Sequence, residues 1–400
     1  MRIPRILHSL SAVLVLLFVN LAWGAATEQV LYLFNAGEMP GGLVLDNAGN
    51  LYGTTYYGGD FNLGSVFELS PSSNGWTRST LYSFTGGTGG SNPGDFQSLV
   101  FDAAGNLYGS TTSGDGGGGT VFKLAPNGGT WTLSVIKHFK AGAPWGTLAF
   151  DTAGNLYGTV CCGGDAVFEL SPTANGVWTY RILHVFKINT SDGNAPRGAV
   201  SFDLSGNLYG TTLWGGGVTT CVNCGTVFKF KPALGGKWSY KVIYRFKGGA
   251  DGKHPSTGVI SDPTGNLYGT TPEGGNTGCT NNGGGGCGTV FKLSPNSNGT
   301  YKETRILVFT GSTTDGGAPE GGVIFDQSGN LDGTTSAGGL YSIGTVFQLT
   351  PQANRWKETL LYSFNPNVDY GAPSTGVILD PSGNLYGVSG GRSEAYEVTP

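Results

Sequence analysis

Charged residues are scarce in this 400-residue chain, and their scarcity excludes several classes of partner. Asp, Glu, Lys and Arg make up 12% of the sequence, and the formal net charge is −4. Ordinary globular proteins carry about 25% charged residues. A weakly acidic, charge-poor chain has no basic patch for nucleic acid or for an anionic membrane surface. After the N-terminus no segment approaches ~20 consecutive apolar residues, so we also expect no membrane span in the mature chain.

Residues that carry out chemistry are scarce as well. The sequence has four His residues, and it contains no Gly-x-Ser-x-Gly, His-Glu-x-x-His or phosphate-loop pattern. Only His254 falls in an expected surface loop of the mature chain. Pairs of carboxylates, as used in glycoside cleavage, leave no local motif and stay open. The sequence therefore predicts no particular catalytic residue, metal or cofactor.

The N-terminus has the pattern of an export signal. Arg2 and Arg5 precede a nearly unbroken apolar run at 10–21, and small residues follow it. This run is short for a membrane span and typical of a signal peptide, although an uncleaved anchor is the alternative. We expect a signal peptide at 1–26 and a mature protein at 27–400 that is secreted, periplasmic or displayed at the cell surface.

One segment recurs seven times along the chain. The pattern Asp-x-x-Gly-Asn-Leu-Tyr-Gly returns at intervals of roughly 50 to 65 residues, and repeats of this period indicate a propeller or a solenoid. The copies begin at Asp46, Asp102, Asp151, Asp203, Asp262, Asp326 and Asp380. One irregularity is Asp332, which stands where the other copies have Tyr.

Each repeat predicts four short strands. In the unit 198–246 the strand-like runs lie at 198–203, 207–212, 225–230 and 238–246, separated by turns rich in Gly, Pro and Asn. The last repeat ends after its third strand, while the segment 29–34 resembles the fourth strand at 359–364. We therefore predict an all-β, seven-bladed propeller of four-stranded blades, forming one domain. The N-terminal strand is expected to join the last blade and close the ring.

The repeat resembles a known family. Asp-x-x-Gly-Asn-Leu-Tyr-Gly-Thr-Thr at 262–271, followed by Gly-Thr-Val-Phe-Lys-Leu-Ser-Pro at 288–295, is similar to the GloVer tandem repeat. The resemblance covers nearly the whole mature chain and implies an exported protein, but it implies no known activity. Members often bear C-terminal sorting anchors, but the residues up to Pro400 show no sorting motif, so we do not carry the family's surface anchoring over as an expectation. The last repeat also departs from the pattern, with Glu-Ala-Tyr-Glu-Val at 394–398.

The Asp-x-x-Gly-Asn turns have a structural and a calcium-binding interpretation. Asp bonds nearby backbone N–H groups, and Gly supplies the positive φ of a tight turn. Calcium takes about six to eight oxygen ligands, more than one Asp and one Asn supply. We interpret the turns as structural. The Tyr of each turn and the Trp that begins most fourth strands are interpreted as inter-blade packing.

Loops of variable length mark one face of the expected ring. The loops between second and third strands range from the brief 160–165 to the long 271–288, while the turns of the opposite face are uniformly short. Variable loops on a rigid scaffold usually carry binding sites. Our candidates for contacting a sugar ring or a protein are the ring-bearing side chains of this face: Tyr56, Trp145, Trp214 and His254. The alternative is that each packs against its own loop.

A set of acidic residues is expected on the same face. In four repeats an Asp stands four residues before the Pro that precedes the first strand, near the expected mouth of the central channel. These residues are Asp192, Asp251, Asp315 and Asp369. They could gather a cation or hydrogen-bond a ligand, and capping of their own turns is the alternative.

All six Cys residues fall in loops between second and third strands. Disulfides are the default in an exported protein. The expected pairs are Cys221–Cys224, Cys279–Cys287 and a vicinal Cys161–Cys162. A zinc site built from four thiolates of neighbouring blades is the alternative, but the eight-residue separation of Cys279 and Cys287 fits zinc ligands poorly.

These features favour an exported, non-enzymatic propeller that binds a glycan or an extracellular protein through its variable, Cys- and Gly-rich loop face, as a monomer. One alternative is a carbohydrate-active hydrolase or lyase with carboxylates such as Glu273 and Glu320 at the channel mouth. A purely structural cell-surface protein is another. Carboxylates that meet in one pocket would favour the enzyme, and an exposed aromatic platform would favour binding.

Overall fold

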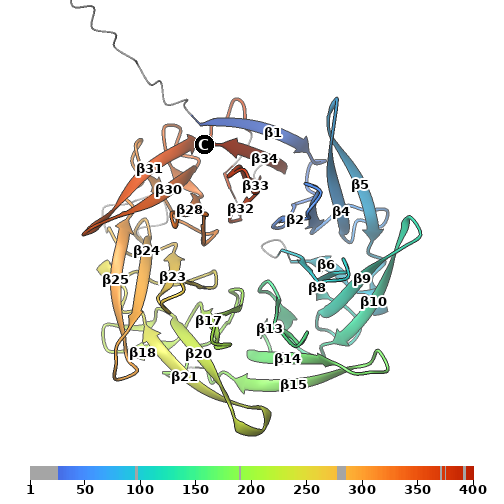
Figure 1. The fold of residues 1–400 in the computed structure, drawn as a ribbon, viewed down its shortest axis with the longest axis horizontal. Coiled ribbons are helices and arrows are strands. Elements are labelled where there is room, and N and C mark those ends of the chain that lie inside the picture. The colour runs from blue at the N-terminus through green and yellow to red at the C-terminus, as the bar shows by residue number, and fades with distance from the viewer. Residues whose placement is uncertain are drawn as a thin grey trace, which may run out of the picture.

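Seven antiparallel blades form a ring (Figure 1). The computed structural model describes residues 26–94, 98–188, 191–276, 285–369, 372–373, 375–390 and 393–400. The predicted signal peptide, up to residue 25, lies outside these ranges. The described residues form no α-helix, and their short 3₁₀ segments are not long and apolar enough to cross a membrane. The predicted all-β, seven-bladed propeller is therefore confirmed.

In each of the first six blades, four strands follow one another in sequence order. The first blade consists of β2 (Val44–Leu45), β3 (Leu51–Thr55), β4 (Ser65–Ser72) and β5 (Gly75–Ser83). The second consists of β7 (Val100–Phe101), β8 (Leu107–Ser113), β9 (Thr120–Asn127) and β10 (Thr130–His138). The third consists of β12 (Ala149–Phe150), β13 (Leu156–Cys161), β14 (Ala166–Pro172) and β15 (Trp178–Val185). The fourth blade consists of β16 (Ser201–Phe202), β17 (Leu208–Thr212), β20 (Thr226–Ala233) and β21 (Lys237–Arg245). The fifth consists of β22 (Ile260–Ser261), β23 (Leu267–Thr271), β24 (Thr289–Pro295) and β25 (Tyr301–Val308). The sixth consists of β27 (Val323–Phe325), β28 (Leu331–Thr335), β30 (Thr345–Gln352) and β31 (Arg355–Ser363).

The seventh blade combines both ends of the chain. Its strand order is β32 (Ile378–Leu379), β33 (Leu385–Ser389), β34 (Glu394–Thr399) and β1 (Thr27–Leu33). β1 runs antiparallel to β34, with Thr27 opposite Thr399 and Leu33 opposite Glu394. The outermost strand of the last blade thus comes from the N-terminal part of the described chain.

Short extra elements lie between the blade strands. They are β6 (Ser91–Pro93), paired with β8; β11 (Ala143–Pro144), paired with β13; the two-stranded pairs β18 (Gly216–Val218) with β19 (Cys221–Asn223) and β26 (Gly316–Gly317) with β29 (Ala337–Gly338); and single 3₁₀ turns at Gly87–Gly89, Leu234–Gly236 and Gly249–Asp251.

The recurring Asp forms a closed hydrogen-bond network in its turn. One carboxylate oxygen of Asp203 accepts the backbone N–H groups of Ser205 and Asn207, both at 2.9 Å. The other accepts the side-chain amide of Asn207 at 2.7 Å and the hydroxyl of Tyr209 at 2.9 Å. Burial alone would raise the pKa of Asp203, but these bonds outweigh burial and hold it below its usual value. The structural interpretation of the turn is confirmed, since the carboxylate is already satisfied.

Aromatic contacts join each blade to the next. The Phe that follows each outer strand meets the aromatic ring of the third strand in the following blade, with ring centroids 4.9 to 5.4 Å apart. The seven pairs are Phe34–Phe67, Phe84–Phe122, Phe139–Phe168, Phe186–Phe228, Phe246–Phe291, Phe309–Phe347 and Phe364–Tyr396. Five of the pairs meet edge-on, whereas Phe139–Phe168 and Phe186–Phe228 are tilted. Edge-on contacts are a preferred aromatic geometry, and aromatic pairs bury large apolar areas.

The motif Tyr and the fourth-strand Trp form a second inter-blade contact. In five interfaces their rings lie 5.8 to 6.4 Å apart, which confirms the packing predicted for them. This contact explains the irregular Asp332. Between the sixth and seventh blades, Ala26 occupies the place of the Trp, eight residues before the terminal Phe, so a Tyr there would lack its partner. Asp332 is buried and instead accepts the side-chain amide of Gln348 at 3.0 Å.

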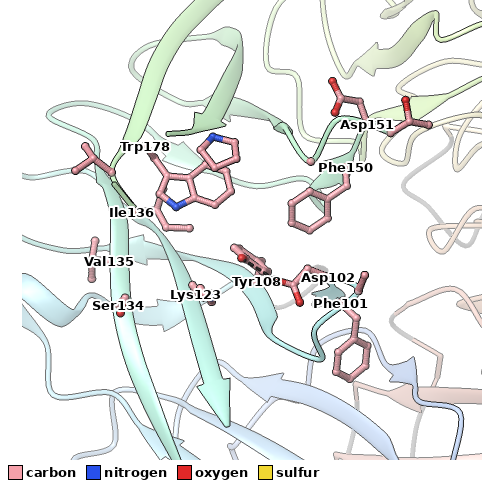
Figure 2. Close-up of a pocket in the computed structure, with 16 residues that line it drawn as sticks. Phe101, Asp102, Tyr108, Lys123, Ser134, Val135, Ile136, Phe150, Asp151 and Trp178 are labelled. Carbon is pink, nitrogen blue, oxygen red and sulfur yellow. Dashed lines mark hydrogen bonds between the residues drawn. The ribbon is translucent and has the colours of Figure 1, made fainter. Parts of the chain in front are cut away.

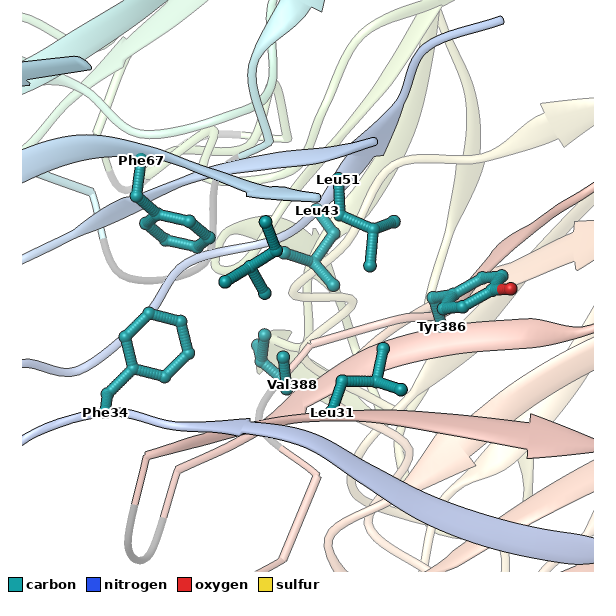
Figure 3. Packing of buried hydrophobic residues seen from close by; sticks show 9 residues of the cluster. Leu31, Phe34, Leu43, Leu51, Phe67, Tyr386 and Val388 are labelled. Atoms are coloured by element: carbon teal, nitrogen blue, oxygen red, sulfur yellow. The ribbon is translucent and has the colours of Figure 1, made fainter. Parts of the chain in front are cut away.

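A hydrophobic cluster spans the junction of the seventh and first blades (Figure 3). Leu31 of β1 and Val388 of β33 come from the seventh blade. Leu51 of β3 and Phe67 of β4 come from the first. Side chains that are distant in sequence thereby share one core.

A group of buried carboxylates lies at β34 of the seventh blade. Glu394 of β34 is 0% exposed, and both its oxygens lack a hydrogen-bond partner. Burial raises its pKa to about 8, and the nearby carboxylates of Glu28 and Asp369 add to the effect. Burial, together with Asp369, likewise raises the pKa of Glu28 to about 7. A protonated Glu394 avoids the large cost of an isolated buried charge.

We expect the free energy of unfolding to fall as the pH rises from about 5 to about 8. Folded Glu394 keeps its proton up to about pH 8, whereas an unfolded Glu releases it near 4.5. Over this window the folded state binds more protons, so acidification stabilises it. Urea titrations at the two pH values measure the difference. Glu394→Gln should reduce the difference in the free energy of unfolding between the two pH values by on the order of 2 kcal/mol. An unchanged slope in that variant, with Glu397→Gln of the same strand as control, would contradict the assignment.

The Asp turn predicts a graded loss of stability. Asp102 accepts four hydrogen bonds, one of them from Tyr108 at 3.0 Å. Tyr108→Phe removes one bond and should cost about 1 kcal/mol, whereas Asp102→Ala removes all four and should cost about 3 kcal/mol. Chemical denaturation of both variants measures the ratio. Equal losses would mean that the tyrosine contact, and not the turn network, carries the effect.

Candidate functional site

A cavity of about 480 Å³ lies where the first strands of the blades converge. Its lining includes residues of every blade, from Leu43 in the first to Val377 in the seventh. Glycines allow this convergence. A Cβ on Gly146 would lie 2.2 Å from the carbonyl oxygen of Gly198, and one on Gly198 would lie 2.6 Å from the carbonyl carbon of Thr257. Larger residues at these positions would push the inner strands apart.

A Pro precedes the first strand of each blade. In four blades the next residue lines this cavity, and these four residues differ from one another in size and charge. They are Trp145, Arg197, Ser256 and Glu320. Of these, the sequence singled out Trp145 and Glu320 but not Arg197 or Ser256. The signal that could have found them is positional, because each follows a Pro of the repeat just as Trp145 does.

Arg197 brings the two predicted Trp residues together. Its guanidinium carbon lies 5.0 Å from the ring centroid of Trp145 and 5.7 Å from that of Trp214. Trp214 is still 37% exposed. Both distances fall within the range of cation–π attraction. We call Trp145, Arg197 and Trp214 the aromatic–arginine cluster. It combines two flat apolar surfaces with one positive charge. Trp145 and Arg197 line the cavity, whereas Trp214 is not among its lining residues.

A vicinal disulfide borders this cluster. Cys161 and Cys162 are bonded to each other, and a guanidinium nitrogen of Arg197 lies 3.6 Å from the sulfur of Cys162. Asp165 fixes the arrangement. One of its oxygens accepts the N–H of Cys162 at 2.8 Å, and the other accepts the N–H of Ala195 at 2.7 Å. The loop of the third blade is thereby tied to the segment that carries Arg197.

The second predicted disulfide supports the loop of His254. Cys221 and Cys224 are bonded, and the N–H of His254 donates to the carbonyl of Cys224 at 2.9 Å. The imidazole lies 3.0 Å from the carbonyl oxygen of Asn223 and 2.8 Å from Glu273. Both ring nitrogens thus face oxygen atoms of the neighbouring loops, so His254 is engaged within its own scaffold. The third predicted pair involves Cys279, which lies outside the described residues.

The two carboxylates considered for catalysis have opposite environments. Burial raises the pKa of Glu273, but bonds from Lys253 at 2.8 Å and from His254 outweigh it and leave the pKa below its usual value. Glu273 is not among the cavity-lining residues, whereas Glu320 is. Glu320 is open to solvent, yet the surrounding wall raises its pKa by burial. The described lining therefore has one carboxylate, and the structure does not pair it with Glu273.

The remaining predicted residues lie elsewhere on the structure. Tyr56 packs edge-on against Tyr57, with centroids 4.8 Å apart, and does not line the cavity. None of the four Asp residues proposed for the channel mouth lines it either. Each accepts a backbone N–H close by in its own loop, from Lys187, Lys247, Thr310 and Asn365 respectively.

These Asp residues lie beside the outer strands instead. The hydroxyl of Tyr244 donates to Asp251 at 2.5 Å, and that of Tyr362 donates to Asp369 at 2.7 Å. Both Tyr residues belong to fourth strands, on the outside of the ring. Turn capping, the alternative considered for these residues, describes their contacts.

Grooves between neighbouring blades are a second kind of cavity (Figure 2). One of about 900 Å³ is lined by Tyr108, Lys123 and Trp178, and another of about 920 Å³ is lined by the equivalent Tyr268, Lys292 and Trp356. In both, the Lys ammonium lies over the Tyr ring, at 5.8 and 5.4 Å. The grooves repeat with the blades and consist of scaffold residues. The cavity where the first strands converge, which we call the axial cavity, carries a different residue after the repeat Pro in four blades and is the better candidate site.

Comparison with known proteins identifies the repeat. Residues 18–187 match the Gloeobacter/Verrucomicrobia repeat, which confirms the predicted resemblance. No curated protein matches the chain.

Solved structures of low sequence identity share the fold. The extracellular domain of a protein described as a hybrid two-component system from B. thetaiotaomicron aligns with a TM-score of 0.58 at 9% identity, covering 92% of this chain. This chain spans only 39% of that one. A Lactobacillus plantarum protein aligns with a TM-score of 0.52 at 14% identity, covering 88% of this chain and 99% of that one. These likenesses concern the propeller architecture alone.

Disulfide mapping tests the cysteine chemistry of the site. We expect Cys161, Cys162, Cys221 and Cys224 to resist alkylation without reductant and to become labelled after denaturation and reduction. Mass spectrometry of proteolytic fragments measures both states. Labelling of Cys162 in the native, unreduced protein would contradict the vicinal bond, because Cys162 is exposed and a free thiol there would react.

Proposed function

We propose that this chain, which carries the repeat identified above, is an exported, non-enzymatic protein that binds a carbohydrate at the rim of its axial cavity. The aromatic–arginine cluster is the observation that supports the proposal. Sugar rings present an apolar face and a rim of hydroxyl groups, so an indole beside hydrogen-bonding groups is suited to them. Hydroxyl side chains such as Ser98, Thr147 and Ser256 line the same cavity.

The carboxylates argue against the hydrolase or lyase. Glycoside hydrolysis ordinarily uses two carboxyl groups on either side of the scissile bond. Glu320 is the one carboxylate in the described cavity lining, and Glu273 lies outside it, in an ion pair with Lys253 and a hydrogen bond with His254. A single acid with a raised pKa provides a proton donor but no nucleophile or base to accompany it.

The exposure of Trp214 argues against a purely structural role. If loop aromatics served only to pack their own loops, Trp214 would be buried like the aromatic rings between blades. Instead Trp214 is 37% exposed, and it lies against Arg197, which lines the cavity. A carbohydrate fits this mixture of apolar and hydroxyl groups better than a protein partner, which would require a larger continuous contact surface.

We expect a cavity-binding oligosaccharide to raise the thermal stability of the protein. A ligand at a hundred times its dissociation constant adds about 2.7 kcal/mol to the free energy of unfolding. Thermal unfolding against a panel of neutral and acidic oligosaccharides identifies the ligand, and calorimetry measures its affinity. Trp145→Ala and Trp214→Ala should each weaken binding about tenfold, because each removes a stacking surface.

Tyr341→Ala is the matched control, since Tyr341 is an exposed aromatic residue that belongs neither to the cavity lining nor to the aromatic–arginine cluster. It should leave the affinity unchanged. Binding that survives both Trp substitutions would move the site away from the cavity. Appearance of cleaved sugar during prolonged incubation would restore the enzymatic alternative.

A further inference from the structure

Building on the carbohydrate site proposed above, we propose that the axial cavity prefers acidic sugars. A carboxylate of the ligand would dock on Arg197, and Glu320 would weaken the complex when it is ionised. The proposal names the chemical class of the ligand, a uronic acid, and two side chains with opposite effects on its affinity.

Arg197 differs from every other described Arg in its hydrogen bonds. Arg78 and Arg181 form ion pairs with Glu38 and Glu169, respectively. The other three donate to oxygen atoms: Arg245 to Ser191, Arg305 to Ala250 and Arg355 to Gln352. Arg197 has no oxygen acceptor among the described residues: its hydrogen bond goes to the sulfur of Cys162, a weak acceptor, and its Nε, like that of Arg78, is buried without a partner.

Aromatic rings stabilise the charge of Arg197 without neutralising it. The contacts with Trp145 and Trp214 attract the cation to the ring faces, but they supply no acceptor for its N–H groups. A guanidinium in this state is suited to a carboxylate, whose two oxygens match its planar donors. A uronic acid provides such a carboxylate on a ring that also stacks on an indole. A neutral sugar provides the ring alone.

Glu320 places a negative charge in the same cavity. Arg197 and Glu320 are the two ionisable side chains among the described lining residues, and no ion pair joins them. An ionised Glu320 repels a ligand carboxylate, whereas a protonated Glu320 donates a hydrogen bond to it. Burial raises the pKa of Glu320, so its protonated form persists to a higher pH than that of an exposed Glu. Affinity for an acidic sugar should therefore rise on acidification, as long as the sugar itself stays ionised.

The test compares uronic acid disaccharides with their own methyl esters. Esterification removes the charge and keeps the sugar, so the pair isolates the carboxylate. We would titrate digalacturonate, diglucuronate and dimannuronate, together with their esters, into the mature protein at about pH 5 and about pH 8. At least one acid should bind about tenfold or more tightly than its ester, in line with a charge-assisted hydrogen bond.

Two substitutions assign the effect to the named side chains. Arg197→Gln should abolish the preference for the acid, and Arg197→Lys should retain part of it because the charge remains. Glu320→Gln should strengthen binding of the acid at about pH 8 and flatten its pH dependence. Lys137→Gln is the matched control. Lys137 also makes a cation–π contact, 4.4 Å from the ring centroid of Tyr180, but on an outer strand. It should behave as the unmodified protein does.

The outcomes separate this proposal from the preceding one. Equal binding of acids and esters would overturn the acidic preference and leave the carbohydrate site standing. The same conclusion would follow if neutral oligosaccharides bound and no uronate did. Absence of binding by any carbohydrate, with the variants folded as judged by circular dichroism, would overturn both. A preference for the acid that persists in Arg197→Gln would assign the charge recognition to another residue and contradict the role given to Arg197.

Discussion

The ring depends on the contact between the Phe that follows each outer strand and the aromatic ring of the next blade. This Phe is held twice. Its backbone N–H donates to a carbonyl of its own blade, which belongs to a Gly in five blades and to Asp165 or Ser393 in the other two. Phe84, for example, donates to Gly64 at 3.0 Å, and its ring packs edge-on against Phe122 of the next blade. The side chain therefore fixes the position of one blade relative to the next. The same two positions are in contact at all seven interfaces, and residues of all seven blades line one cavity where the inner strands converge.

A uniform scaffold confines chemical differences to a few positions. The Asp turns, the motif Tyr and the aromatic contacts recur from blade to blade, so they cannot distinguish one side of the axis from another. The residue after each repeat Pro is free to vary, because it lies at the rim and not in the core. Trp145, Arg197 and Glu320 thus give the cavity its asymmetry, with a positive aromatic sector and an acidic one.

Sequence reasoning placed the local features well and the contacts between loops poorly. The role of Asp203 follows from its own turn, four residues long, and was predicted. The pairing of Trp145 with Trp214 through Arg197 joins residues from neighbouring blades, and Arg197 was not considered. The four Asp residues were expected at the channel mouth, but they lie beside outer strands. Their loops turn back on the strand they follow before the chain reaches the axis.

The sequence alone determined the number of blades, the strands of each blade and the scaffold residues. Periodicity reveals these features because each copy is stabilised by contacts that every other copy repeats. Only the tertiary structure decided which irregular residues meet. Proximity across the axis depends on how the blades close and on how each loop folds over the rim, and neither leaves a period in the sequence. Glu273 illustrates the difference, since the fold places it outside the cavity lining and next to Lys253 and His254, which its position in the repeat did not reveal.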